Sequence, residues 1–342
     1  AGCAFLAAFM LKAVAFVRPP RVDDRIEIHA HEQPELFRFL YRLADEAGAP
    51  RPHRVFVSPR VNAAVFYEPT PMNLAIPSRK NLEIGLGLVN SLSLGEFRAV
   101  LAHEFGHFAQ RAMAVGRWVC AAQQIAAQLV ARRDRLDAVL DRIVRRDVRL
   151  AWPAALVRVV VWSIRALVDT MFRVVLAMQR ALSREMEFDA DLVAVSLTGS
   201  DALVHALHRL EAADDAWQRA VGFVMNEKSQ GRVVRDLFEI QTGIVAQLAR
   251  LLDDPHYGAT PPRGAHAEPG SHRLFDVGLA RPPQMWLSHP CNHEREANAK
   301  RRYVAAPVDE RPAWTLFEQA AGLRARVTAA LIGDVPPEAT PH

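Results

Sequence analysis

Cysteine is scarce in this chain of 342 residues, which contains only three. An odd number of widely separated cysteines builds neither a disulfide framework nor a four-cysteine metal site. A reducing compartment fits this usage best. Internal repeats are absent as well. The three cysteines are Cys3, Cys120 and Cys291.

A strong charge of one sign is also lacking. The formal net charge is +4 and comes mostly from arginines spread along the chain. Because no aromatic-basic motif accompanies this mild excess, no nucleic-acid partner is predicted. Half of the residues are apolar and 23% are charged, which is slightly apolar for a fully soluble protein. We therefore expect membrane association, whereas the sequence does not determine the oligomeric state.

The apolar run at the N-terminus is at the short limit for crossing a bilayer. Residues 1–17 are broken only by Lys12, and Arg18 and Arg21 follow them. Arginines in that position favour a cytoplasmic location for the chain that follows. We interpret residues 1–20 as the end of a transmembrane helix. A buried helix or a leftover signal segment is the alternative.

Hydrophobic periodicity predicts an α+β fold that is mainly α-helical. A first helix is expected over residues 33–47, and helical patterns recur over 117–150, 202–252 and 314–331. Between them, four short segments rich in β-branched and aromatic residues predict a small antiparallel-type sheet. These segments are residues 54–57, 63–67, 73–76 and 82–86.

Two further segments are described by their composition. Residues 154–180 are very apolar, but their charged residues fall within roughly 80° of one another on a helix. A helix with one charged face can lie in a membrane interface, or it can pack its wide apolar face against the rest of the protein. The sequence is compatible with both interpretations. Residues 253–283 concentrate proline, glycine and histidine and predict a flexible loop.

The segment His103-Glu104-Phe105-Gly106-His107 carries the main candidate chemistry. The capping-box sequence Ser93-Leu94-Gly95-Glu96 predicts that a helix starts there and continues to about Met113. On a helix, His103 and His107 project from one face and can bind one zinc ion together. Glu104 is the candidate general base, which would activate a zinc-bound water. Gly106 would let another backbone approach closely.

A catalytic zinc site needs three protein ligands and an open position for water. The best third candidate is Glu187, in a predicted helix that also carries Asp191 four residues later. Asp191 would then accept a hydrogen bond from the remote ring nitrogen of a zinc-bound histidine, His103 being the candidate, and fix its tautomer. The other histidines lack acidic partners at metal-ligand spacing and are not predicted to be ligands.

These residues resemble the M48 metallopeptidases, which include the HtpX and Ste24 proteases. The resemblance rests on four elements that occur in the family's order: the histidine motif, Ser-Arg-x-x-Glu-x-x-Ala-Asp at residues 183–191, Asn62-Ala63-Ala64-Val65-Phe66 with Gly85-Leu86-Gly87-Leu88-Val89, and His289-Pro290 with Arg295. Together they span residues 54–296. Two departures are that the aromatic residue after Asn62 is displaced, and that Cys291 stands where the family commonly has a second proline.

The resemblance implies an enzyme and assigns roles to its residues. It implies a zincin (gluzincin) core, with the sheet beside the His-Glu-x-x-His helix, and hydrolysis of peptide bonds in protein substrates with one catalytic Zn²⁺. The edge strand with Asn62, Ala63 and Ala64 would align a peptide. His289 and Arg295 would support the oxyanion or the geometry of the site.

Organisation and location follow from the same resemblance. Residues 21–300 would form the metallopeptidase domain, and residues 301–342 a C-terminal helix and tail. The protein would associate with a bacterial-type inner membrane, with its catalytic domain facing the cytoplasm. The alternative function is a non-catalytic, zinc-containing, membrane-associated module that binds peptides or proteins. A membrane scaffold with a fortuitous histidine pair is a third reading, which a large distance between Glu187 and the histidines would support.

Overall fold

The computed structural model describes residues 24–67, 80–109, 182–260, 268–275 and 290–333, together with residues 163, 166 and 170. The predictions for residues 1–20, 73–76 and 117–150, nearly all of 154–180 and parts of 253–283 lie outside these ranges. The chain divides into two compact units. The larger comprises Arg21–Glu68, Ser78–Gln110 and Glu185–His342. Of the smaller, the structure describes only residues 163, 166, 170 and 182–184, all of them helical.

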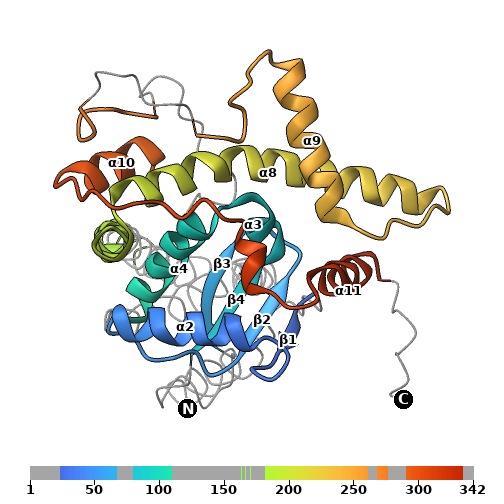
Figure 1. Ribbon diagram of the computed structural model, residues 1–342, viewed down its shortest axis with the longest axis horizontal. Helices are drawn as coiled ribbons and strands as arrows, with labels where there is room; N and C mark the ends of the chain where they lie inside the picture. The colour runs from blue at the N-terminus through green and yellow to red at the C-terminus, as the bar shows by residue number, and fades with distance from the viewer. Residues whose placement is uncertain are drawn as a thin grey trace, which may run out of the picture. The chain divides into compact units, whose positions relative to one another are not determined.

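A four-stranded sheet forms the centre of the larger unit (Figure 1), and its strand order is β1-β2-β4-β3. The strands are β1 (Ile26–Ile28), β2 (Val55–Ser58), β3 (Ala63–Tyr67) and β4 (Lys80–Gly85). The antiparallel pairs are β1 with β2 and β3 with β4. In contrast, β2 and β4 run parallel, so the prediction of an antiparallel-type sheet is wrong for this pair. The physical reason is that β4 returns between β2 and β3 after two reversals of chain direction.

The helix predicted over residues 33–47 and the helix predicted from Ser93 are both present. Helix α2 (Pro34–Glu46) buries Leu36, Leu40 and Leu43, and α3 (Leu86–Ser91) follows β4 directly. Helix α4 (Leu94–Ala109) contacts α2, β3 and α8 (Ser200–Ser229). Its predicted capping box is confirmed, because the Ser93 N–H donates to Glu96 Oε2 at 2.8 Å and the Glu96 N–H donates to Ser93 Oγ at 3.4 Å.

The second half of the larger unit is helical. The helix Leu182–Thr198 bends by 119° into α8, and Gly199 occupies the bend with a φ of 84°. The helical region predicted over 202–252 is two helices, because Gly231 takes a φ of 74° and Asp236 caps the start of α9. The remaining elements are α9 (Leu237–Leu251), α10 (Asn292–Lys300), the 3₁₀ helix η4 (Ala313–Leu316) and α11 (Ala320–Ile332).

Membrane-spanning potential is limited in the part of the chain that the structure describes. No single helix there has both the length and the apolar composition to cross a bilayer. The helices Leu182–Thr198 and Ser200–Ser229 meet these two criteria only when taken together, across their 119° bend.

Candidate metal centre

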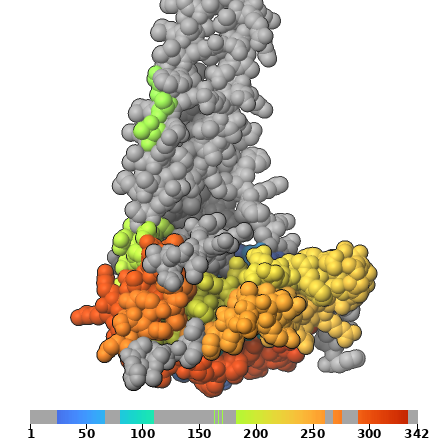
Figure 2. Space-filling view, turned by 90° about the horizontal axis from the view of Figure 1, so that it is seen from above, coloured from blue at the N-terminus to red at the C-terminus, as the bar shows by residue number. Residues whose placement is uncertain are grey.

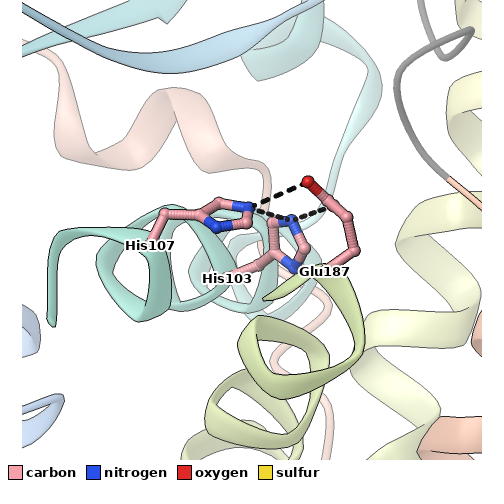
Figure 3. Close-up of side chains that lie close together, drawn as sticks. All are labelled: His103, His107 and Glu187. Carbon is pink, nitrogen blue, oxygen red and sulfur yellow. Dashed lines mark hydrogen bonds and ion pairs between the residues drawn. The ribbon is translucent and has the colours of Figure 1, made fainter. Parts of the chain in front are cut away.

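Two imidazole rings from α4 form one side of the centre (Figure 3). His103 and His107 are one helical turn apart, and their Nε2 atoms lie 3.2 Å from each other. The ring planes are nearly perpendicular, at 86°. His103 is buried and His107 is half-buried. The i and i+4 spacing thus brings two ring nitrogens to one point, as the sequence predicts.

Glu187 supplies a third donor from the helix Leu182–Thr198. Its Oε2 lies 3.4 Å from Nε2 of His103, and its Oε1 lies 3.4 Å from Nε2 of His107 (Figure 3). Among the described residues, these three side chains are the one group of histidine, cysteine or acidic residues whose ligand atoms converge as a metal site requires. Tetrahedral zinc bonds of about 2.0–2.1 Å place neighbouring ligand atoms about 3.3–3.4 Å apart. The three side chains therefore fit a zinc ion.

A close helix crossing produces this convergence. A Cβ atom on Gly106 would lie 2.9 Å from Cα and 3.2 Å from Cβ of Ala190, which belongs to the helix Leu182–Thr198. Real Cβ atoms essentially never approach another atom as closely as 2.9 Å. The expected role of Gly106 is therefore confirmed, and Ala190 is identified as its partner. Since Ala190 lies between Glu187 and Asp191, the crossing brings both carboxylates to His103.

Asp191 holds the far side of the His103 ring. Its Oδ1 lies 2.9 Å from His103 Nδ1, while Arg295 donates from Nε to Oδ2 at 3.0 Å and from Nη2 to Oδ1 at 2.5 Å. Asp191 is fully buried and Arg295 is 1% exposed. Because a carboxylate only accepts hydrogen bonds, the contact favours a proton on Nδ1, so that Nε2 is the nitrogen whose proton a metal ion can replace. Arg295 thus lies on the Nδ1 side of the His103 ring, where its Nη2 is also 3.3 Å from Nδ1.

The protonation of these buried groups follows from their contacts. Burial and the Arg295 charge lower the pKa of His103, but its hydrogen bonds to Asp191 and Glu187 and the Asp191 charge outweigh them, so the pKa is raised to about 9. Burial raises the pKa of Asp191, yet Arg295 and His103 lower it more, so Asp191 stays ionised. A metal ion must therefore displace a proton from His103.

Glu104 is half-buried on α4, next to His103. Within the described ranges, no residue forms a hydrogen bond or an ion pair with its carboxylate.

The predicted peptide-binding residues lie at the start of the last strand in the order of the sheet. Ala63 and Ala64 begin β3, which is the edge strand next to β4, and α4 packs against β3. The backbone carbonyl of Asn62 accepts a hydrogen bond of 2.7 Å from the Gly85 N–H. A Cβ on Gly85 would lie only 2.1 Å from the Arg60 carbonyl oxygen, so only glycine fits there. His289 lies outside the described residues.

Several contacts around the centre were not predicted from the sequence. Lys80 donates from Nζ to the carbonyl of Phe108 at 2.6 Å and so caps the end of α4. Asn298 of α10 donates from Nδ2 to the carbonyl of Phe188 at 2.9 Å, directly after Glu187. Both bonds end on backbone carbonyls, which leave no signal in the sequence. Cys291 is a half-buried free thiol before α10.

Comparisons with known proteins agree with the geometry. The model of the family described as "Peptidase family M48" matches residues 30–303. "Protease HtpX homolog" of Nostoc punctiforme is 30% identical over 233 residues, which cover 65% of this chain and 73% of that protein. The "Protease HtpX homolog" of Trichormus variabilis is 31% identical over 186 residues, with coverages of 53% and 58%. "Protease HtpX homolog 2" of Methanosarcina mazei is 28% identical over 232 residues, with coverages of 64% and 72%. No solved structure matches the chain significantly.

Proposed function

The chain belongs to peptidase family M48 and is a metalloprotease, and from this premise we propose that His103, His107 and Glu187 hold one catalytic zinc ion in a zincin (gluzincin) core. One observation carries the proposal. The two Nε2 atoms lie 3.2 Å apart, and each lies 3.4 Å from a different oxygen of the Glu187 carboxylate, so one atom of each side chain can reach a common zinc ion. The fourth coordination position is left for water or substrate.

Glu104 is the general base and acid of the proposed reaction. Zinc bound at this site would lower the pKa of a water molecule and polarise the peptide carbonyl. Glu104 takes a proton from the water that attacks the carbonyl carbon, and it then delivers this proton to the departing amine nitrogen as the C–N bond breaks. Its half-buried position beside His103 suits this role.

Asp191 and Arg295 position the ligand His103 in this proposal. Asp191 accepts from Nδ1 of His103, so the ring keeps its orientation and Nε2 keeps its lone pair. Arg295 binds both oxygens of Asp191 and fixes the carboxylate in turn. The family resemblance implies that Arg295 supports either the oxyanion or the geometry of the site. These contacts favour the second role, because the guanidinium lies on the Nδ1 side of the His103 ring.

The edge strand β3 is proposed to align the substrate peptide. The Gly85 N–H donates to the Asn62 carbonyl, so these two residues form a hydrogen-bonded pair of the antiparallel ladder. Hydrogen-bonded and non-hydrogen-bonded pairs alternate, so the N–H and C=O groups of Ala63 and Val65 face outward. An extended peptide would pair with those groups. The residues that the resemblance assigns to substrate binding, Asn62, Ala63 and Ala64, begin this segment.

A non-catalytic, zinc-containing module that binds peptides is the alternative function. Such a module would be expected to have a structural zinc site, in which a fourth protein side chain fills the remaining coordination position. Within the described residues, the converging group contains three side chains only. The third reading, a fortuitous histidine pair, is contradicted by the 3.4 Å contacts between Glu187 and both histidines. The first observation favours the hydrolase over the binding module, and the second favours a metal site over a fortuitous pair.

Location and substrate class complete the proposal. The family implies peptide or protein substrates. We propose association with a bacterial-type inner membrane and a cytoplasmic catalytic domain, on the strength of the apolar residues 1–17 followed by Arg18 and Arg21, and of the resemblance to the HtpX group.

The proposed mechanism is tested by Glu104→Gln. This variant should bind one zinc ion per chain like the native protein, because Glu104 is not a ligand. Hydrolysis of casein or a peptide library should fall about 10²- to 10⁴-fold, the usual contribution of general acid-base catalysis. Glu185→Gln makes the same chemical change at an exposed position two residues before Glu187 and should leave activity unchanged. Undiminished hydrolysis by zinc-loaded Glu104→Gln would contradict the mechanism.

A further inference from the structure

Helix α10 contacts the helix that carries Glu187 at two points. Arg295 and Asn298 are three residues apart and therefore lie on one face of α10. Arg295 binds the Asp191 carboxylate at 3.0 and 2.5 Å, and Asn298 Nδ2 donates to the Phe188 carbonyl at 2.9 Å. The two acceptors, on Phe188 and Asp191, are also three residues apart. The two helices are thus joined in register.

The two contacts together restrict rotation of the helix Leu182–Thr198 about its own axis. From α10, attachment through Asp191 alone would oppose rotation of this helix about its own axis at one point only. With side chains about 5–6 Å from that axis, a rotation of about 10° would move a ligand atom by about 1 Å. Metal sites tolerate deviations of only about 0.2 Å in ligand distances. The second contact, at Phe188, adjoins Glu187 in the chain and opposes this rotation.

We propose that Asn298 is a positioning residue for the zinc ligand Glu187, and that it acts through the carbonyl of Phe188; this inference rests on the proposed function. The bond requires a donor on the side chain, because a carbonyl oxygen only accepts. The Asn298 carboxamide provides that donor from a half-buried position. Its effect is on the rotation of the Glu187 helix, whereas Arg295 acts on His103, both through Asp191 and through its own Nη2, which lies 3.3 Å from His103 Nδ1.

The other side of α10 is anchored independently, so the helix can serve as a fixed reference. The buried Glu296 carboxylate accepts from the backbone N–H groups of Leu274 and Phe275 at 2.9 to 3.1 Å. Lys300 pairs with Glu296 at 2.8 Å and donates to the His272 carbonyl at 2.6 Å. In Figure 2, the segment 268–275 and α10 form one continuous orange to red surface beside the helix Leu182–Thr198.

The test is Asn298→Asp, which keeps the size of the side chain, removes the donor and turns an acceptor toward the Phe188 carbonyl. We expect the zinc Kd, measured by competition with a chelator, to rise about 10-fold or more, as for other groups that orient metal ligands. The visible absorption bands of the Co²⁺-loaded protein should also change, because they report the ligand geometry.

Asn292→Asp is the matched control on the same helix. Asn292 donates to Glu211 of α8 at 2.7 Å, so this variant also loses a hydrogen bond of α10, but one that does not involve the Glu187 helix. It should lower the Tm without changing the zinc Kd or the Co²⁺ spectrum. The proposal is overturned if Asn298→Asp binds zinc like the native protein, or if Asn292→Asp weakens zinc binding equally. A native protein that binds no zinc would instead refute the proposed function.

Discussion

Gly106→Ala tests whether the zinc centre depends on the close crossing of two helices. The new Cβ would lie 2.9 Å from Cα, 3.2 Å from Cβ and 3.3 Å from the carbonyl oxygen of Ala190. Optimal separations are about 3.5–4.0 Å, so the helices must move apart by about 0.6–1 Å. Glu187 moves with its helix, and its 3.4 Å distances to the two histidines lengthen accordingly.

The effects on stability and on zinc binding should differ. Alanine is favoured over glycine inside a helix by about 1 kcal/mol, while overpacking costs about 1–3 kcal/mol. The free energy of unfolding in the presence of a chelator should therefore fall by about 0–2 kcal/mol. The displaced Glu187 should raise the zinc Kd about 10- to 100-fold, which is the range seen when ligand orientation is disturbed.

Chelator competition measures the zinc Kd, and denaturant unfolding with chelator present measures the stability. Gly222→Ala is the control, because a Cβ at this position inside α8 would meet nothing within 4 Å. That variant should keep the native zinc Kd and gain up to about 1 kcal/mol of stability. If Gly106→Ala binds zinc as tightly as Gly222→Ala, the reasoning about the helix crossing is refuted.

Three further predictions concern protonation, burial and the sheet edge. Because the pKa of His103 is raised to about 9, zinc binding near pH 7.5 should release about one proton and tighten as the pH rises toward 9; calorimetric enthalpies that do not depend on the buffer would contradict this. Lys300→Met should lower the free energy of unfolding by about 3 kcal/mol, because Glu296 is 0% exposed and would lose its counter-charge. Denaturant unfolding should show that the double variant Lys300→Met, Glu296→Gln does not suffer this loss and is about as stable as the native protein. Val65→Pro removes an outward N–H and should raise KM about 2- to 10-fold with zinc content unchanged, whereas Ala64→Pro breaks the ladder with β4 and unfolds the strand; an unchanged KM would argue against peptide pairing on β3.

The local elements around the centre could be predicted because their signals are contained in short segments. The capping box at Ser93 and Glu96 depends on residues three apart, and the structure shows both of its hydrogen bonds. The histidine pair likewise depends on one helical turn. Glu187 and Asp191 could be selected as candidates because their spacing places two carboxylates on one helical face, and the structure brings both to His103.

The contacts that set the precision of the centre could not be predicted, because their partners are distant in the chain or are backbone atoms. Gly106 indicated a close approach, but nothing in the sequence named Ala190 as its partner. Asn298 binds a carbonyl 110 residues away, and any residue could have supplied that oxygen. The parallel pairing of β2 with β4 escaped prediction for a similar reason, since the β-like segments do not reveal the order of the strands.

The central claim is that His103, His107 and Glu187 bind one zinc ion. The most direct measurement is an anomalous difference map, recorded at the zinc absorption edge from crystals of the zinc-loaded protein. It should show one strong peak about 2.0–2.2 Å from Nε2 of each histidine and from the Glu187 carboxylate. A peak bound by other residues, or none at this position at full zinc loading, would contradict the account.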